Sequence, residues 1–152
     1  MLVKSSMRRF FLGVFAVVFL SACGGPVEGL SPTFSYVGSL EGFTNARAAA
    51  MQCNTTCGTG IVVTREPGHV PLEEVSDPAW AIEQSGLTTS RGREPLRVQV
   101  YAYTGERQKE IFAHEFGHAL GLEHSPHDTN IMWAVEGGPV VRVVNAEACS
   151  AL

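Results

Sequence analysis

The amino-acid sequence predicts an α+β fold, in which a sheet and two main helices form one domain. Two segments have the composition of strands: Gly60–Thr64 is a continuous β-branched run, and Leu96–Tyr103 alternates between apolar and polar residues. Two others favour helices, because Phe43–Gln52 is rich in alanine and Glu106–Leu120 carries apolar residues at helical spacing. The chain has 152 residues, which is enough for one domain with one core.

The N-terminal residues are predicted to be an export signal and not part of the fold. Lys4, Arg8 and Arg9 form a positively charged start. Residues 10–20 then form an apolar run of eleven residues, which is too short to span a membrane and typical of a signal peptide.

The end of this signal, Leu20-Ser21-Ala22-Cys23, resembles a bacterial lipobox, in which the cysteine is lipidated and becomes the first residue. Plain secretory cleavage after Ala22 would place Leu20 where a small residue is usual. A lipid on Cys23 would anchor the protein without spanning the membrane, in the bacterial cell envelope and at the outer membrane of a Gram-negative cell. The chain then divides into a signal peptide (1–22), a lipidated tether (23–32) and a folded domain (33–152).

The charge of the chain argues against nucleic acid as a partner. The full sequence has a net charge of −4, and loss of Lys4, Arg8 and Arg9 leaves 8 basic against 15 acidic residues. The sequence has no basic patch interleaved with aromatic residues, which nucleic-acid binding favours. We expect a monomer that meets the membrane through its lipid anchor alone.

The first half of the domain is expected to begin with a strand at Thr33–Val37. The alanine-rich helix follows, with Thr44 as a possible N-cap. The strand at Gly60–Thr64 has no polar alternation, which predicts burial on both faces. Arg65–Ala79 contains proline, glycine and acidic residues and is predicted to be a loop.

The second half is expected to contain short strands at Trp80–Ile82 and Gly86–Ser90 before the longer strand described above. Thr104 is a plausible N-cap for the helix at 106–120. Gly137–Pro139 is predicted to be a loop, and Val140–Val144 is apolar. Asn145–Leu152 is predicted to be a final helix with Asn145 as its N-cap.

Three cysteines remain if Cys23 is lipidated. Because an exported protein meets an oxidising compartment, a disulfide is expected. Cys53 and Cys57 are the nearest pair and form the possible disulfide, but either one could pair with Cys149 instead.

The most informative stretch is the motif His-Glu-x-x-His-x-x-Gly-x-x-His at residues 114–124. A helix turns about 100° per residue, so His114 and His118 lie on one face with their Cβ atoms about 5–6 Å apart. His124 cannot reach the same point unless the helix ends, and Gly121 permits that break because glycine adopts positive φ. Three neutral imidazoles would then converge on Zn²⁺ with a fourth position open, and Glu115 lies beside the pair as a base.

This motif resembles the signature of the metzincin zinc peptidases, and of their matrixin branch in particular. The resemblance implies a zincin-like fold with a mixed, twisted sheet of about four or five strands, an active-site helix, a methionine turn and a C-terminal helix. Met132, within Asn-Ile-Met, fits the methionine of that turn. Matrixins usually place proline two residues after the methionine, whereas Trp133 and Ala134 follow here.

The resemblance also implies where substrate binds. One strand before the active-site helix is an exposed antiparallel edge that accepts an extended peptide, and we assign it to residues 86–90, with Leu87, Thr88 and Thr89 as substrate-binding residues. Trp133 would contribute to the wall of the specificity pocket, and Val140–Val144 could line it.

Other potential ligands are expected to be solvated or to lie outside the metal site. His69 lies alone in the predicted loop at 65–79, where larger matrixins bind further zinc and calcium ions. The sequence has no Asp/His cluster there, so calcium is not supported. His127 and Asp128 are expected at the surface or behind the three histidines.

The sequence therefore predicts a zinc-dependent endopeptidase with a protein or peptide substrate, in which Glu115 activates a zinc-bound water. Two alternatives remain open. One is a surface lipoprotein that binds zinc without catalysis, against which an intact Glu115 argues. The other is a zinc hydrolase that acts on cell-wall peptides.

Overall fold

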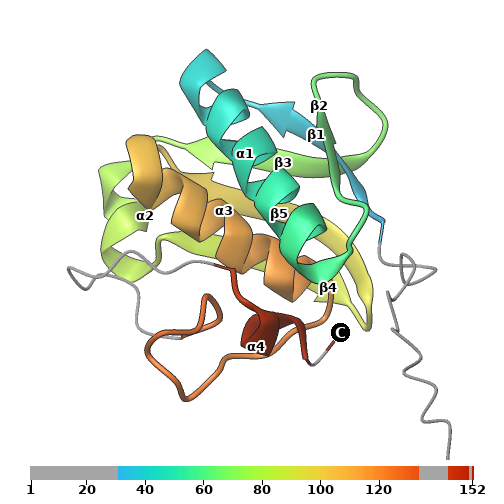
Figure 1. Cartoon of the computed structure of the whole chain (residues 1–152). Helices are drawn as coiled ribbons and strands as arrows, with labels where there is room; N and C mark the ends of the chain where they lie inside the picture. Colours follow the sequence, from blue (N-terminus) through green and yellow to red (C-terminus); the bar gives the residue numbers. More distant parts are fainter. Residues whose placement is uncertain (1–30, 134–143, 151) are drawn as a thin grey trace, which may run out of the picture.

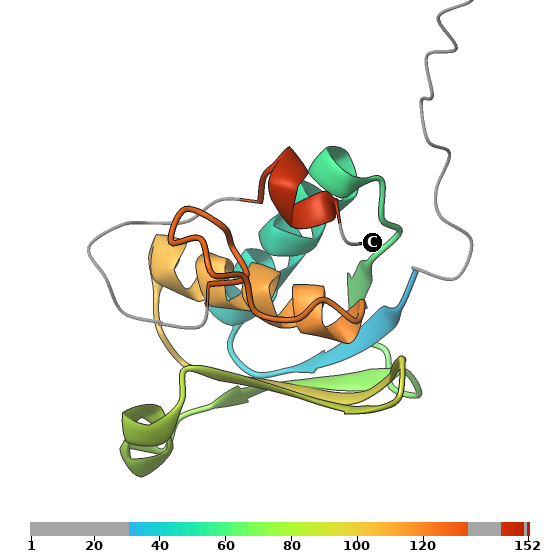
Figure 2. The ribbon, with the colours of Figure 1, turned by 90° about the horizontal axis from the view of Figure 1, so that it is seen from below.

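The computed structural model describes residues 31–133, 144–150 and 152, which form a sheet covered by helices on one face (Figure 1, Figure 2). The sheet has five strands in the order β2-β1-β3-β5-β4. Neighbouring strands are parallel except for the last pair, β5 and β4, which are antiparallel. The sheet is therefore mixed, as expected. Its strands are β1 (Thr33–Val37), β2 (Val62–Thr64), β3 (Val70–Val75), β4 (Gly86–Arg91) and β5 (Glu94–Tyr101).

The described residues also form four helices, which are α1 (Leu40–Cys57), α2 (Pro78–Glu83), α3 (Gly105–Ala119) and α4 (Ala146–Cys149). Helices α1 and α3 lie side by side on the same face of the sheet, and the short α4 lies beside α1 (Figure 2). The core fills the space between these two long helices and the sheet. Its largest fully buried side chains include Phe34 on β1 and Phe112 and Phe116 on α3. The rings of Phe34 and Phe116 lie 5.1 Å apart.

Helix α1 is longer than the predicted helix at 43–52. It begins after Ser39, whose Oγ accepts a hydrogen bond from the Gly42 amide at 2.9 Å, so Ser39 and not Thr44 is the N-cap. The Thr44 hydroxyl instead donates to the Leu40 carbonyl oxygen, one turn earlier. The helix ends at Gly58, whose φ of 67° is the left-handed conformation that glycine adopts most readily.

Two expectations for residues 60–79 are wrong, namely the burial of the strand at 60–64 on both faces and the loop at 65–79. The apolar strand lies at the edge of the sheet as β2, where Val62 is 50% exposed, so it is not buried on both faces. The predicted loop contains β3, the central strand of the sheet. Its acidic side chains are accommodated by partners from other elements: Glu73 pairs with Arg97 and Glu74 accepts from Tyr36.

The strand expected at Trp80–Ile82 is also wrong, because these residues lie in α2. Asp77 caps this helix by accepting from the Ala79 amide, and Pro78 begins it. The strands at 33–37, 86–90 and 96–103 are confirmed as β1, β4 and β5, and the histidine-containing helix is confirmed as α3. The C-terminal helix is shorter than predicted, but Asn145 is its N-cap and accepts from the Ala148 amide.

The disulfide joins Cys57 at the end of α1 to Cys149 on α4, with Cα atoms 5.2 Å apart. The pairing of Cys53 with Cys57 is therefore corrected in favour of the alternative with Cys149. Cys53 lies one turn before Cys57 on the buried face of α1 and is a free thiol. Burial raises its pKa to about 12, so this thiol stays protonated.

Several expectations concern residues outside the described part of the chain. These are the signal peptide, Cys23 and most of the tether, the loop at 137–139 and residues 140–143. Within the described part, every helix is too short or too polar to cross a bilayer.

Candidate metal centre

The three histidines of the motif meet at one point. His114 and His118 lie one turn apart on α3, and their Nε2 atoms are 3.1 Å apart. The Nε2 atom of His124, which comes from the turn after the helix, also lies 3.1 Å from that of His118. Among the described residues this is the group of side chains that could hold a metal ion. The spacing argument from the sequence is thus matched by the geometry.

The turn that returns His124 to the helix depends on Gly121. Helix α3 ends at Ala119, and Gly121 has a φ of 90°. Its amide donates to the His118 carbonyl oxygen at 2.9 Å, and the Leu122 amide donates to the Gly117 carbonyl oxygen at 2.9 Å. These two bonds form a Schellman motif, which satisfies the last carbonyls of the helix and reverses the chain. The expected role of Gly121 is confirmed.

Two of the imidazole rings are oriented by backbone carbonyl oxygens. The Nδ1 atom of His114 lies 2.7 Å from the Ile131 oxygen, and that of His118 lies 2.8 Å from the Leu122 oxygen. A carbonyl oxygen only accepts, so in each contact Nδ1 carries the proton and Nε2 keeps its lone pair for a ligand. Such carbonyl contacts are the usual support of metal-binding histidines.

The donor set fits zinc. Two nitrogens bound to one tetrahedral zinc at about 2.0–2.1 Å would lie about 3.3–3.4 Å apart, close to the 3.1 Å found for two pairs here. Three neutral imidazoles without a fourth protein ligand are typical of catalytic zinc sites, where water takes the open position. His114 is buried and His124 is exposed, so the site opens to solvent on the side of His124.

Met132 packs against α3 at Gly117. It is 2% exposed, and a Cβ added to Gly117 would come within 2.2 Å of its Sδ. The absence of a side chain at Gly117, between the first two histidines, therefore lets the methionine approach the helix. The Ser125 amide donates to the Met132 carbonyl oxygen at 2.8 Å, which joins the turn to the strand-like segment after His124.

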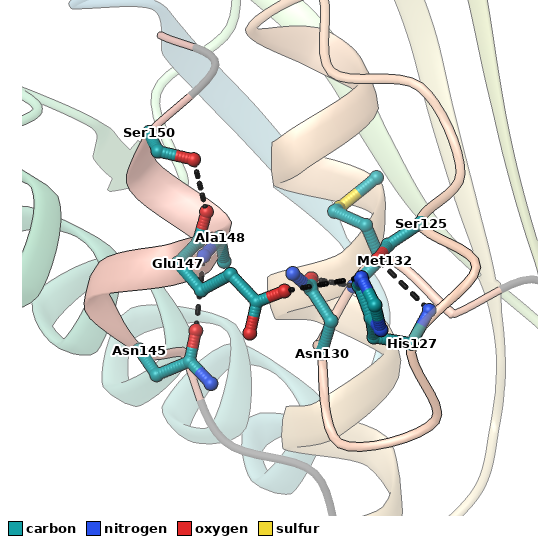
Figure 3. A network of polar contacts seen from close by, with 8 residues as sticks. All are labelled: Ser125, His127, Asn130, Met132, Asn145, Glu147, Ala148 and Ser150. Carbon is teal, nitrogen blue, oxygen red and sulfur yellow. Dashed lines mark hydrogen bonds and ion pairs between the residues drawn. The ribbon is translucent and has the colours of Figure 1, made fainter.

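The methionine turn is closed by Asn130 (Figure 3). Its side-chain oxygen accepts from the Met132 amide at 2.9 Å, and its carbonyl oxygen accepts from the Trp133 amide at 3.0 Å. Because the next residue, Ile131, presents its carbonyl oxygen to His114, the turn both supports and orients the first histidine. The position predicted for Met132 agrees with this geometry.

The side chain of Glu115 lies against the edge strand β4. It is 2% exposed, and its Oε2 accepts a hydrogen bond from the Thr88 hydroxyl at 2.7 Å. A Cβ added to Gly86 would lie 2.3 Å from Glu115 Oε1, so the carboxyl group lies directly against the backbone of β4.

The residues assigned to substrate divide between the two faces of β4. The strand is an antiparallel edge of the sheet, as expected. Leu87 is 39% exposed and Thr89 is exposed on the outer face, whereas Thr88 faces inward to Glu115. Trp133, directly after the methionine turn, is partly buried.

The remaining candidate ligands lie outside the group of three histidines. His69 is exposed before β3. His127 is exposed in the loop before the methionine turn, and its Nε2 lies 3.8 Å from Oε1 of Glu147 on α4 (Figure 3). Asp128 is exposed beside it. The expectation that His127 and Asp128 are surface residues is confirmed.

Sequence reasoning missed the residues that surround the motif. A side chain at Gly86 would clash with Glu115, and one at Gly117 would clash with Met132. These contacts lie 29 and 15 residues away in the chain, so the local sequence does not indicate them. The carbonyl oxygens that orient His114 and His118 carry no side-chain signal at all. The glycine between the two histidines of the motif was the one signal that could have suggested a close approach.

The family model described as peptidase M10, matrixin, matches residues 61–142, which is more than half of the chain and includes β3, the edge strand β4, α3 and the methionine turn. No curated protein matches the chain.

Proposed function

The chain belongs to the matrixin family of metallopeptidases, and we propose that it is a zinc-dependent endopeptidase. The observation that carries this proposal is the convergence of three imidazole Nε2 atoms, two of whose rings are already oriented by carbonyl oxygens, with the buried Glu115 as the next residue after His114 on the same helix. His114, His118 and His124 would hold one zinc ion. Protein and peptide substrates follow from the family.

Zinc, when bound, acts as a Lewis acid that polarises the scissile carbonyl and lowers the pKa of a water molecule to about 7. The chain supplies the proton transfers. Glu115 takes a proton from the attacking water and delivers it to the leaving amine, so the carboxyl group ends the cycle as it began. General acid–base catalysis of this kind contributes about 10²–10⁴-fold.

The edge strand β4 would hold the substrate. Among the residues that the structure describes, no strand pairs with its outer edge, so an extended peptide can pair with its backbone. Leu87 and Thr89 would contact alternate substrate side chains from the exposed face, since neighbouring residues of a strand point to opposite faces. Trp133 would contribute to the pocket beside the methionine turn.

A substitution at Glu115 tests the proposal. Glu115→Gln preserves the size of the side chain and the histidine ligands, so we expect zinc content to stay unchanged and cleavage of casein or a quenched peptide to fall about 10²–10⁴-fold. Glu123→Gln is a matched control, because Glu123 is exposed in the turn before His124 and should retain activity. Cleavage by Glu115→Gln at the parent's rate would contradict the assigned role.

The same assay separates the alternatives. A zinc-loaded protein that cleaves neither casein nor a peptide library but opens cell-wall peptides would be the second kind of zinc hydrolase. One that cleaves none of these substrates would be a zinc-binding protein without catalysis. Lipidation at Cys23 and a location in the cell envelope stay predictions, which labelling of the producing cells with palmitate would check.

A further inference from the structure

The inner face of β4 is shaped around one carboxyl group. Gly86 and Thr88 are two residues apart and therefore share this face. The Thr88 hydroxyl lies 2.7 Å from Glu115 Oε2 and 3.0 Å from the Glu115 carbonyl oxygen. Gly86 brings its backbone against the other carboxyl oxygen, where a Cβ would lie 2.3 Å from Oε1.

We infer that Thr88 is a positioning residue for Glu115, which holds the carboxyl group in the orientation that proton transfer requires, with Gly86 as the surface against which it rests. This inference rests on the proposed function and extends it. It also changes the role of Thr88, which the resemblance assigned to substrate binding.

Burial makes such a partner necessary. A carboxyl group that is 2% exposed has lost most of its water, and charged groups without compensating hydrogen bonds are costly inside a protein. A hydroxyl that donates to a carboxylate forms a charge-assisted bond, and the distance of 2.7 Å is that of a well-formed O–H···O hydrogen bond. The threonine thus fixes a side chain that has three rotatable bonds of its own.

The chemistry of a hydroxyl suits a group that gains and loses a proton in each cycle. A threonine hydroxyl has one proton to donate and two lone pairs that accept. It donates to Oε2 when Glu115 is a carboxylate. When Glu115 carries the proton taken from water, the protonated carboxyl group can donate a hydrogen bond to the Thr88 hydroxyl oxygen. The Thr88 hydroxyl then donates its own proton in a hydrogen bond to the Glu115 carbonyl oxygen, 3.0 Å away. Glu115 keeps a partner in both states.

The position of Thr88 is itself well defined. In the antiparallel pair of β4 with β5, Thr88 lies opposite Val98 and Gly86 opposite Val100, and both valines are fully buried. The irregular register of this pair begins beyond these residues, between Thr89 and Ser90. The strand that would pair with substrate on its outer edge therefore holds the base from its inner face.

Three substitutions test the inference. Thr88→Val keeps the β-branched shape but removes the hydroxyl, and we expect kcat to fall about 10- to 100-fold, with KM within about twofold and zinc content unchanged. Thr88→Ser restores the hydroxyl and should recover most of kcat. Thr55→Val is the matched control, because Thr55 is exposed on α1 and its hydroxyl donates to the Met51 carbonyl oxygen, and its kcat should stay within about threefold of the parent.

The outcomes are distinct. A Thr88→Val enzyme with the parent's kcat would overturn the inference, as would an equal loss of kcat in Thr88→Val and Thr88→Ser at full zinc content. If the parent itself cleaves no peptide, the proposed function fails instead, and the positioning role fails with it.

A second measurement is independent of activity. In the metal-free protein with Glu115 intact, Thr88→Val should raise the unfolding equilibrium constant about tenfold or more, because it removes a hydrogen-bond donor from a buried carboxyl group. In a Glu115→Leu background, Thr88→Val should change the unfolding equilibrium constant by about twofold or less. Equal effects in both backgrounds would show that Thr88 contributes through packing alone, which would contradict the inference.

Discussion

Helices α1 and α3 lie side by side over the same sheet, but they bury different kinds of side chain (Figure 2). The buried residues of α1 are small, and three of them, Ala46, Ala49 and Ala50, are alanines. Helix α3 buries large rings and also four polar or charged side chains, which are Gln108, Glu110, His114 and Glu115. The small residues of α1 allow close packing, whereas α3 carries the candidate site.

Three of these polar residues of α3 divide into two groups. At its start, the Gln108 side chain accepts from Asn45 on α1 at 2.8 Å and donates to Glu74 on β3 at 3.2 Å, so it joins the two helices and the sheet. At its end, His114 and Glu115 face the metal site and the edge strand. Gln108 therefore serves the scaffold and the other two serve the chemistry, and substitutions can separate these roles.

The largest effect is expected from loss of a metal ligand. His118 lies between the other two histidines, with its Nε2 within 3.1 Å of both, so His118→Ala should abolish zinc binding and with it detectable peptidase activity. Elemental analysis of the purified variant measures the zinc directly. His127→Ala is the control, because His127 is exposed and pairs with Glu147. A full complement of zinc in His118→Ala would disprove the ligand assignment.

The next effect concerns the scaffold. Cys149→Ser removes the disulfide that joins α4 to the end of α1 across 92 residues of sequence. Because such a bridge restricts the unfolded chain, we expect the free energy of unfolding to fall by about 2–5 kcal/mol, measured by urea denaturation. The variant should still bind zinc, since its three ligands lie on α3 and the following turn.

Cys53→Ala provides the comparison for this experiment. Cys53 is a free, buried thiol, so its replacement keeps the disulfide and should cost less than Cys149→Ser. If the two variants unfolded at the same urea concentration, the disulfide would contribute nothing beyond the loss of a buried side chain.

The smallest effect is a change in the pH dependence of stability at Glu74. Burial raises the pKa of this carboxyl group. Hydrogen bonds from the Ser39 amide, the Tyr36 hydroxyl and Gln108 together lower the pKa by more than burial raises it, so the pKa lies below its ordinary value of 4.5. A depressed pKa in the folded state stabilises the protein above about pH 4.5, and this contribution is lost as the pH falls through the folded pKa.

Glu74→Gln should therefore flatten the loss of stability between about pH 5 and pH 3, measured by urea denaturation of the metal-free protein. Glu94→Gln is the control, since Glu94 is exposed at the start of β5 and its replacement leaves the contacts of Glu74 in place; it should change the slope less than Glu74→Gln does. An unchanged slope in Glu74→Gln would show that these hydrogen bonds do not favour the ionised form.

The site was more predictable from the sequence than the sheet, for a physical reason. The face shared by His114 and His118 follows from helical geometry, and the reversal at Gly121 follows from the conformations open to glycine. Both depend on neighbours within eleven residues. The disulfide and the Thr88–Glu115 contact join distant segments, and the spacing of the residues gave no means of choosing them.

The errors in the sheet arose where tertiary contacts override local preference. β3 has the sequence Val-Pro-Leu-Glu-Glu-Val, which favours a loop by composition, yet partners on β1, β5 and α3 accommodate its two glutamates. The error at α2 was avoidable, because Asp77-Pro78 is a common way to begin a helix and was present in the sequence.

The proposed site has three imidazoles that share one zinc ion with an open fourth position. X-ray absorption at the zinc edge, on purified protein with one equivalent of zinc, measures this most directly. We expect three nitrogen ligands at about 2.0–2.1 Å and one further light atom from water, with no sulfur ligand. A sulfur ligand at about 2.3 Å, or zinc that the protein does not retain, would contradict the account.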